Sequence, residues 1–355
     1  MSKILVLGAG QIGTAIAAML AGSGDYDVTL GDSDSDALKR DLPEDVKPLV
    51  VDTEDARALE AALKGCDAVV SACPYFLNVA IAEAAAQDGV HFFDLTEDVA
   101  VSRRVRELAA GSDIAFVPQC GLAPGFISIV ANAFVNRFDE PYDVRLRVGA
   151  LPQFPDNALR YNLTWSTEGL INEYCNPCEA IVDGQRREVT PLEGLEYFTI
   201  EGVRYETFST SGGVGTLCET FEGRVRNLNY KTVRYPGHRD LVHMLVSDLR
   251  LCERRDIFRD IIEHGIPTTR QDVVLIFVTV TGLIEGRLTQ ESYVKKIYGN
   301  SAPGGLNGIQ TTTASAACAM VDLHREGKLP AKGFVRQEQA SYSDFIANRF
   351  GQVYA

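Results

Sequence analysis

The sequence predicts an α/β protein of two domains, the first built on a doubly wound parallel sheet and the second an α+β domain with a mostly antiparallel sheet. A glycine-rich loop joins an apolar run to a helical pattern at the N-terminus, and strand and helix patterns then alternate roughly every 20 to 25 residues up to residue 121. Beyond that point the runs alternate like strands between hairpin signals. A length of 355 residues also suits two domains of about 150 residues each.

The N-terminal loop has the pattern of a dinucleotide site. Ile4 to Leu7 is an unbroken apolar run, which is typical of a buried parallel strand. The glycines that follow have the G-x-G-x-x-G spacing, and the helical pattern after them directs backbone N–H groups toward a bound phosphate. We therefore expect a Rossmann-type loop, with cofactor contacts from Gly8, Gly10, Gln11, Ile12 and Gly13.

An acidic residue ends the second predicted strand, Val28 to Asp32. Asp32 stands about 20 residues after the loop, where a carboxylate accepts hydrogen bonds from the ribose hydroxyls. A carboxylate there repels a 2′-phosphate, and the next basic residues are Lys39 and Arg40. These features favour NAD over NADP.

Further predicted strands end in polar residues at the same sheet edge, where ligands of open sheets lie. These strands are Lys47–Val51, Asp67–Ser71, Val90–Asp94 and Ile114–Pro118. We expect cofactor contacts from Asp52, Ser71, Ala72 and Cys73, and catalytic side chains from Tyr75, Asp94 and Cys120. Asp52 is also interpretable as a helix cap, and Cys120 as a small buried thiol.

The predicted first domain covers residues 1–122 and is completed by C-terminal helices from about 303 to 355, while residues 123–302 form a domain for substrate binding and dimerisation. The second domain has strand-like runs at 143–149, 180–189, 197–210, 229–234 and 272–287, and helical patterns at 166–173 and 237–251. The chain returns to helical patterns at 308–327 and 341–350.

Composition and charge exclude several classes of partner. The net charge of −14 argues against nucleic acid or an anionic membrane. No signal peptide or membrane-spanning run is evident, and eight scattered cysteines fit a reducing compartment. We expect a cytoplasmic protein.

Metal binding is not expected. Cys175 and Cys178 form one C-x-x-C pair without further ligands, and His238 and His243 would point about 140° apart on a helix. A redox disulfide between Cys175 and Cys178 is the weaker alternative to two ordinary thiols, since the motif lacks a thioredoxin-like context.

Three stretches resemble the saccharopine dehydrogenase-like oxidoreductases, most closely the lysine 6-dehydrogenase branch. They are Gly121–Gly125 (GLAPG), Ser209–Gly213 (STSGG) and Lys231–His238 (KTVRYPGH), supported by Ser166–Leu170 and Gly333–Glu338. The resemblance covers nearly the whole chain. It implies a nicotinamide cofactor and a small amino-acid substrate, and the sheet of the second domain is expected to supply a homodimer interface.

The chemistry implied is oxidation of a primary amine, with the ε-amine of L-lysine as leading substrate. The products are the 6-semialdehyde, which can cyclise, and ammonia. A lysine amine has a pKa of about 10.4 and must lose its proton first, so activity is expected to rise into alkaline pH. One alternative is a saccharopine- or carboxynorspermidine-type reaction on a secondary amine, and another is a non-catalytic NAD-binding sensor or scaffold.

Substrate contacts follow from the same motifs. Arg234 is the first choice to bind the substrate carboxylate and Lys231 the second. Glu168 and Asp94 are candidate acceptors for the amine, each interpretable also as a helix cap. Further candidates that either touch substrate or only shape the fold are His238, Thr210, Ser211 and Gly212.

Overall fold

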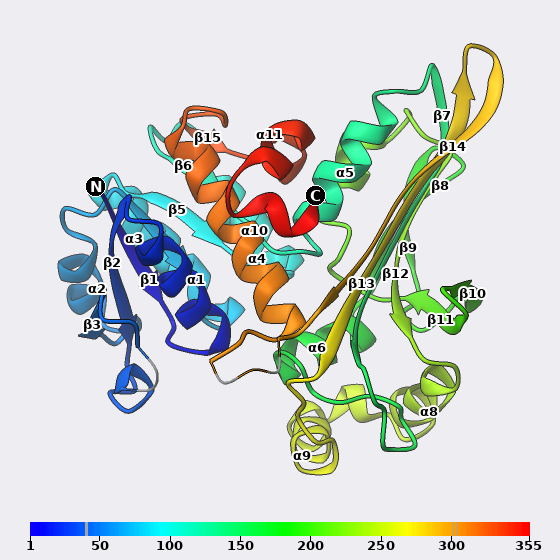
Figure 1. Cartoon of the computed structure of the whole chain (residues 1–355), viewed down its shortest axis with the longest axis horizontal. Coiled ribbons are helices and arrows are strands. Elements are labelled where there is room, and N and C mark those ends of the chain that lie inside the picture. The colour runs from blue at the N-terminus through cyan, green and yellow to red at the C-terminus, as the bar shows by residue number, and fades with distance from the viewer. Residues whose placement is uncertain (40–41, 301, 303) are drawn as a thin grey trace. The chain divides into compact units, whose positions relative to one another are not determined.

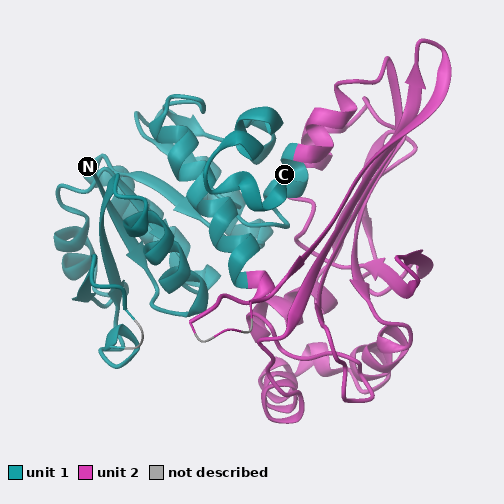
Figure 2. Cartoon of the chain, viewed as in Figure 1, with its two compact units in different colours: residues 1–129, 310–355 teal, residues 130–309 magenta. Residues whose placement is uncertain are grey.

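The computed structural model describes residues 1–39, 42–300, 302 and 304–355. It divides into two compact units (Figures 1 and 2): Met1–Ile129 with Gln310–Ala355, and Val130–Ile309. The predicted boundaries, after residue 122 and near residue 303, lie a few residues before these; residue 303 and Arg40 are outside the described residues. The C-terminal segment thus belongs to the first unit.

The first unit contains a parallel sheet in the order β15-β6-β5-β4-β1-β2-β3, seven strands among the described residues (Figure 1). The strand order reverses between β1 and β4, as in a doubly wound sheet, which confirms the predicted fold class. The strands are β1 Ser2–Leu7, β2 Tyr26–Asp32, β3 Val46–Val50, β4 Ala68–Ser71, β5 His91–Asp94, β6 Ala115–Val117 and β15 Gly333–Phe334. β15 was not predicted, because two residues are too short to show a pattern.

The helices of this unit alternate with its strands along the chain. They are α1 Gln11–Gly22, α2 Ala56–Leu63, α3 Asn78–Asp88, α4 Val99–Ala109, α5 Phe126–Val135, α10 Gly308–Arg325 and α11 Tyr342–Ala347. α5 continues into the second unit, and α10 begins there. The short helical turns are η1 Ala37–Lys39, η2 Tyr75–Leu77, η5 Gln337–Gln339 and η6 Gly351–Tyr354. Asp322 on α10 accepts hydrogen bonds from Tyr26 Oη (2.5 Å) and Asn348 Nδ2 (2.9 Å). This buried carboxylate anchors the C-terminal segment to β2.

The second unit contains a mixed sheet in the order β10-β11-β12-β7-β13-β14, with β8 pairing β12 and β9 pairing β8. Apart from the parallel pair β7–β12, the pairings recorded for the described residues are antiparallel, as predicted. The strands are β7 Glu140–Pro152, β8 Cys178–Val182, β9 Gln185–Val189, β10 Glu196–Ile200, β11 Val203–Ser209, β12 Asn227–Arg234, β13 Asp272–Ile284 and β14 Arg287–Tyr298.

Three hairpins of this sheet turn at acidic residue–glycine dipeptides, which are the hairpin signals expected from the sequence. Asp183-Gly184, Glu201-Gly202 and Glu285-Gly286 have positive φ at both residues, which matches the twist of the flanking strands. The third turn joins β13 to β14, whose length beyond Arg287 was not predicted. Polar and apolar residues alternate only weakly along β14, which explains why the strand beyond Arg287 was not predicted.

The helices of the second unit are α6 Thr167–Cys175, α7 Leu217–Phe221, α8 His238–His243, the π-helical turn η3 Met244–Asp248, η4 Leu251–Glu253 and α9 Arg255–Gly265. The helix predicted over 237–251 is therefore broken, and Arg250 has a φ of 54° in the left-handed region. The apolar side chains of α6 and α9 share one buried cluster with Tyr161 and Phe208. This cluster forms the core beneath the candidate substrate residues.

The favoured prediction of two ordinary thiols at Cys175 and Cys178 is wrong for Cys175, which forms a disulfide with Cys252, 77 residues away. Cys178 is a buried free thiol, so the weaker alternative of a Cys175–Cys178 disulfide is wrong as well. The contact depends on the packing of η4 against the end of α6, which the spacing of cysteines along the chain does not reveal.

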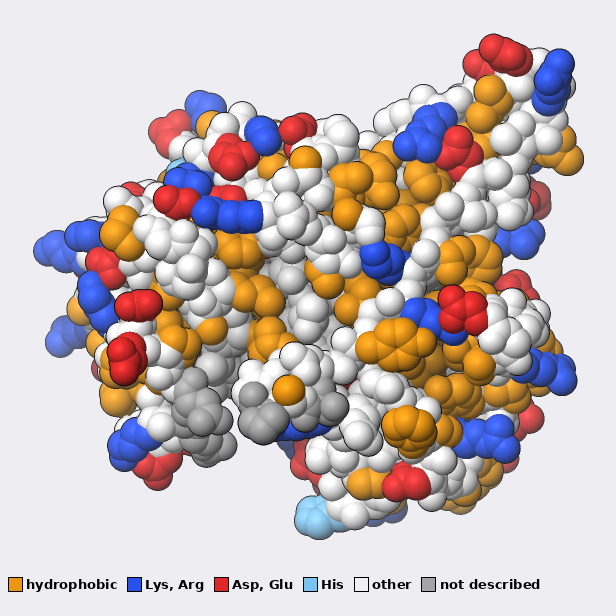
Figure 3. Space-filling model, viewed as in Figure 1, with side chains coloured by type: hydrophobic (Ala, Val, Ile, Leu, Met, Phe, Trp, Pro, Cys, Tyr) orange, Lys and Arg blue, Asp and Glu red, His pale blue; other side chains and the backbone are white. Residues whose placement is uncertain are grey.

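The surface mixes charges of both signs. On the face drawn in Figure 3, acidic and basic side chains are interspersed among polar and apolar ones. No helix among the described residues has both the length and the apolarity to cross a lipid bilayer. Within the same residues, no three His, Cys, Asp or Glu side chains gather into a group that could hold a metal ion.

Candidate functional site

Two glycines of the N-terminal loop are required by close packing. Gly8 has a φ of 100°, and a Cβ on it would lie 2.8 Å from the carbonyl oxygen of Ala72. A Cβ on Gly13 would lie 1.8 Å from the carbonyl oxygen of Gly8. The loop, the first turn of α1 and the end of β4 therefore approach each other too closely for any side chain at these two positions.

Gly10 has open space instead. No atom of the described residues lies within 4 Å of the position that its Cβ would take. Gly10 is the N-cap of α1, and in this part of the structure neither a side-chain cap nor an acidic residue satisfies the first turn, which begins with Gln11 and Ile12. The partial positive charge of a helix N-terminus thus faces an open position, which fits the pyrophosphate of a dinucleotide.

Asp32 lies against this loop. Its Oδ2 accepts a hydrogen bond from the N–H of Ala9 (2.6 Å), and its Oδ1 accepts one from the N–H of Asp34 (2.8 Å). The carboxylate therefore sits at the end of β2 beside the glycines, where a ribose would bind. Nearby, the Lys39 ammonium pairs with Asp36 at 2.7 Å.

The other residues predicted for the cofactor follow β3 and β4. Asp52 is exposed and accepts from the N–H of Glu54 (2.9 Å), while Asp55 caps α2, so the cap interpretation applies to Asp55. Ser71 is buried and donates to Asn78 Oδ1 (2.6 Å). Burial raises the pKa of the Cys73 thiol to about 12. Ala72 contacts the loop through Gly8, and Tyr75 is partly buried at the start of η2.

Asp94 ends β5 as a fully buried carboxyl. Its Oδ1 accepts hydrogen bonds from the N–H groups of Gln119 (2.9 Å) and Thr96 (3.0 Å). Its Oδ2 has no hydrogen-bond partner among the described residues. Burial raises the pKa of Asp94 to about 7, although both backbone hydrogen bonds oppose the shift. Such a group can take up or release a proton near neutral pH.

Cys120 lies beside Asp94 and is fully buried. Its thiol donates to the carbonyl of Val117 (2.9 Å) and accepts from Gln337 Nε2 (3.3 Å). Burial raises the pKa of this thiol, and the Asp94 carboxyl raises it further. The thiol therefore stays protonated and is unsuited to act as a nucleophile. Gln337 is not among the predicted site residues, although it lies in the Gly333–Glu338 stretch that supports the family resemblance.

In the second unit, Arg234 is the centre of a buried polar cluster. Its Nε donates to Tyr174 Oη (3.2 Å), its Nη1 to Thr232 Oγ1 (2.6 Å), and its Nη2 lies 3.4 Å from Glu173 Oε2. The guanidinium also stacks over the ring of Tyr161, 4.8 Å from its centroid. We call this group, with His238, the Arg234 cluster. Sequence patterns did not reveal Tyr161, Glu173 or Tyr174.

His238 completes the cluster as a neutral side chain. Its Nδ1 lies 2.8 Å from the carbonyl of Leu159, so that nitrogen carries the proton. Its Nε2 then accepts from Tyr174 Oη (2.9 Å). Burial lowers the pKa of His238 to about 3, and the nearby Arg234 charge contributes to this. The ordinary histidine pKa near 6.5, which drew attention to this residue, therefore does not apply in the folded protein.

Lys231 is not part of this cluster. It lies three residues before Arg234 on β12, so the two side chains point to opposite faces of the sheet. Its Nζ donates to Glu196 Oε1 (2.6 Å), and the other oxygen of Glu196, Oε2, pairs with Arg147 (3.1 Å). The structure separates the two cations that the sequence grouped together.

The other residues predicted to contact the substrate lie in different surroundings. Glu168 is partly exposed and pairs with Arg259 on α9 at 2.9 Å. Ser211 is held by the backbone, since its N–H donates to Glu173 O (3.0 Å) and its Oγ to Pro177 O (2.8 Å). Gly212 has a φ of 90° and forms the turn. Thr210 is buried, and its Oγ1 lacks a hydrogen-bond partner within the described residues.

Comparisons with known proteins agree with this architecture. The family model for the saccharopine dehydrogenase NADP binding domain matches residues 4–113, and the model for the saccharopine dehydrogenase C-terminal domain matches residues 121–352. The structure of the apo histidine-tagged saccharopine dehydrogenase (L-Glu forming) from Saccharomyces cerevisiae shares the fold, with a TM-score of 0.79 at 16% identity, covering 97% of this chain and 95% of that chain.

Curated relatives match at 23% and 26% identity. The mitochondrial alpha-aminoadipic semialdehyde synthase of Mus musculus is 23% identical over 226 residues, 56% of this chain and 24% of that protein. The saccharopine dehydrogenase [NADP(+), L-glutamate-forming] of Saccharomyces cerevisiae is 26% identical over 264 residues, 69% of this chain and 57% of that protein. The matched part is thus about a quarter of the mouse protein and a little over half of the yeast one. Because the family models match both parts of the chain, this protein belongs to the saccharopine dehydrogenase family of NAD(P)-dependent oxidoreductases.

Proposed function

We propose that this protein oxidises an amino acid at a carbon that bears an amine, with NAD as preferred cofactor and the ε-amine of L-lysine as leading substrate. The observation that carries the proposal is Asp94, a buried carboxyl at the carboxyl edge of the nucleotide-binding sheet with one unpartnered oxygen and a pKa raised to about 7. The family membership supports amino-acid oxidation in lysine metabolism.

Asp94 is assigned the role of base. The N–H groups of Thr96 and Gln119 bond to Oδ1, so Oδ2 is the oxygen that remains to take up a proton. Above about pH 7 the carboxylate form predominates and can accept a proton from the substrate ammonium. The bound nicotinamide would accept the hydride. The substrate amine has a pKa of about 10.4, so activity is expected to rise again between about pH 9 and 10.

The cofactor preference rests on Asp32. Its carboxylate would accept hydrogen bonds from the ribose hydroxyls and repel a 2′-phosphate. The ammonium of the nearby Lys39 pairs with Asp36 in this structure. The names of the yeast relatives specify NADP(+), so the preference is a property to be measured on this chain.

The Arg234 cluster is assigned to the substrate carboxylate. Arg234 Nη2 makes only a long contact, 3.4 Å, with Glu173, so a carboxylate from the substrate would form a stronger bidentate interaction.

The test is to incubate the purified protein with NAD or NADP and each amino acid of a panel, and to follow the absorbance of the reduced nicotinamide. Reduction of NAD by L-lysine with release of ammonia is the expected result. Reduction by saccharopine alone would favour the secondary-amine reaction that the yeast relatives' names describe. Dinucleotide binding without reduction by any amine would overturn the proposal and support a sensor.

A further inference from the structure

The segment from His238 to Cys252 is fastened at both ends to one helix. At its start, His238 Nε2 bonds Tyr174 Oη (2.9 Å), and at its end Cys252 forms the disulfide with Cys175. Tyr174 and Cys175 are consecutive residues at the end of α6. We call residues 238–252 the strap. Its two attachment points are therefore one residue apart on α6.

The strap is irregular and only partly packed between these ends. It consists of α8, the π-helical turn η3, a left-handed residue at Arg250 and the short turn η4. Val242 and Leu251 are buried in the cluster shared with α6, whereas Leu241 (37%), Met244 (40%) and Leu249 (57%) remain exposed. The middle of the strap thus buries less apolar surface than Val242 and Leu251 near its ends.

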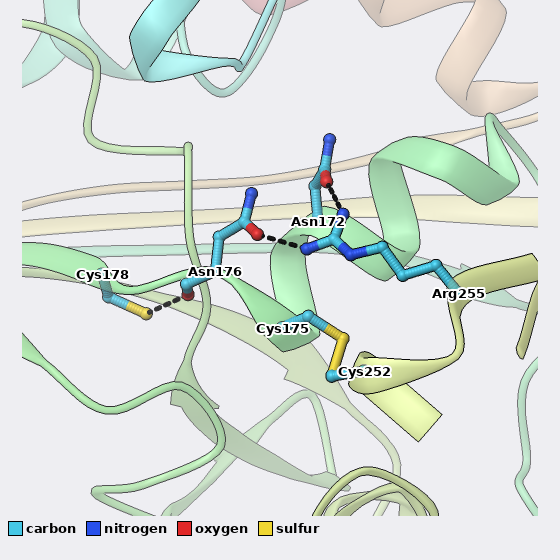
Figure 4. Close-up of a disulfide and its surroundings, with 6 residues drawn as sticks. All are labelled: Asn172, Cys175, Asn176, Cys178, Cys252 and Arg255. Atoms are coloured by element: carbon cyan, nitrogen blue, oxygen red, sulfur yellow. Dashed lines mark hydrogen bonds between the residues drawn. A yellow bond between two sulfur atoms is a disulfide. The ribbon is translucent and has the colours of Figure 1, made fainter. Parts of the chain in front are cut away.

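The disulfide lies next to a second attachment of the same helix (Figure 4). The guanidinium of Arg255 donates to Asn172 Oδ1 (2.7 Å) and Asn176 Oδ1 (2.5 Å), one residue on each flank of the Glu173–Cys175 turn. These bonds hold the start of α9, beyond the strap. The disulfide thus ties the end of the strap to α6 beside Tyr174, while α9 has its own contacts with α6.

We propose that the Cys175–Cys252 disulfide is a redox control of the Arg234 cluster. Breaking it frees the end of the strap, and the disturbance reaches Arg234 through His238 and Tyr174, which are joined by hydrogen bonds. The inference rests on the proposed function where it concerns substrate affinity. Reduction is expected to weaken binding of the amino acid and to leave dinucleotide binding unchanged.

The reductant must come from outside the protein. A dithiol supplies two electrons and two protons, so that the S–S bond breaks, two thiols form, and the sulfurs of the dithiol become joined in a disulfide. Cys175 and Cys252 are both partly exposed and can be attacked. The thiol of the nearby Cys178 is not suited to attack the disulfide, because it is buried, bonds the carbonyl of Asn176 and has a pKa raised by burial to about 12.

The sole tryptophan of the chain provides a readout that needs no substrate. Trp165 Nε1 donates to Tyr161 Oη (3.2 Å), and the Tyr161 ring stacks against Arg234. A change in the Arg234 cluster should therefore alter the fluorescence of Trp165 in the native state. If the disulfide only stabilises the fold, its reduction would lower the melting temperature and leave native-state emission unchanged.

The experiment compares air-oxidised and dithiothreitol-reduced full-length protein, together with Cys252→Ser and, as a matched control, Cys178→Ser. We expect reduction to shift Trp165 emission and to raise KM for the amino acid at least threefold. Cys252→Ser should resemble the reduced protein and ignore dithiothreitol, whereas Cys178→Ser should respond like wild type. If Cys252→Ser folds poorly, Cys175→Ser and the reduced wild type provide the same comparison.

Two outcomes would overturn the proposal: identical emission from oxidised and reduced wild-type protein, or a thiol titration that finds eight free thiols in the oxidised sample, the number of cysteines in the chain. An emission shift without a change in KM for a substrate that is turned over would also overturn it. If no amino acid is oxidised, the proposed function fails, but the emission arm still decides whether the disulfide controls the cluster.

Discussion

The glycine loop of the first unit and the Arg234 cluster of the second differ in how they are assembled. The loop is contiguous, from Gly8 to Gly13, and adds Asp32 from the next strand. The cluster draws its side chains from three separate stretches: Tyr161 before α6, Glu173 and Tyr174 at its end, and Thr232, Arg234 and His238 around the end of β12. A parallel sheet brings strand ends to one edge, whereas a mixed sheet combines side chains by register and by face.

The two regions also differ in how their charges are satisfied. The N-terminus of α1 has neither side-chain cap nor acidic first turn in the described residues, so it can accept an anion directly. Arg234 is already compensated by Glu173 and hydrogen-bonded by Tyr174. A ligand of the second region must therefore exchange with an existing partner, and mutations there should affect folding and binding together.

The largest expected effect comes from the sheet edge of the first unit. Replacing Asp94 by Asn removes the proposed base and should lower kcat by about 10²- to 10⁴-fold. In wild type, kcat should fall below about pH 7 as the carboxyl becomes protonated. The measurement is kcat as a function of pH for both proteins, at saturating substrate. An unchanged kcat in the variant would remove Asp94 from the chemistry.

The same variant should be more stable than wild type. Because the pKa of Asp94 is raised from 3.8 to about 7, the folded protein retains a proton that the unfolded chain releases, and stability falls as pH rises through this window. Asn removes that penalty, so at pH 8 the gain should be about 1 kcal/mol or more, or about 2–4 °C in melting temperature. At pH 4 the two proteins should melt at similar temperatures, which serves as the control.

The second-largest effect tests whether Arg234 and Lys231, on opposite faces of the mixed sheet, have different roles. Arg234→Lys loses the planar donor set and should raise KM for the amino acid about 30- to 100-fold, equivalent to about 2–3 kcal/mol. Lys231→Met, on the opposite face, should change KM less than about threefold, since its partner Glu196 is half-exposed. Both KM values are measured for amino acid and dinucleotide. Equal effects of the two substitutions on KM for the amino acid would contradict the assignment of Arg234.

The predictable parts of the molecule were those determined by neighbours along the chain. The glycine spacing, the alternation of strands and helices, and the turn at Glu285-Gly286 each depend on a few consecutive residues. The mostly antiparallel character of the second sheet followed from such turns. Asp94 was placed at the sheet edge because a strand ends there, but its raised pKa follows from burial, which only the folded structure reveals.

The unpredicted parts depend on contacts between distant stretches. β15 is recognisable only because it pairs with β6, and Gln337 reaches Cys120 only because that pairing brings the C-terminal segment beside it. His238 became neutral because aromatic side chains and Arg234 surround it. Cys252 lies 77 residues from Cys175 in sequence, so the spacing of the cysteines gave no sign of the disulfide and Cys175 was expected to be an ordinary thiol.

The smallest expected effect distinguishes two glycines of one motif. A Cβ on Gly13 would overlap the carbonyl of Gly8, whereas one on Gly10 would meet no described atom. Gly13→Ala should therefore lower the melting temperature. Gly10→Ala should fold normally yet bind NAD at least about tenfold more weakly, because its methyl group would occupy the space through which a pyrophosphate approaches the backbone. Melting curves and NAD titrations of both variants test this. Normal NAD affinity in a well-folded Gly10→Ala protein would mean that the cofactor does not approach the loop at this glycine, and the open position would then need another explanation.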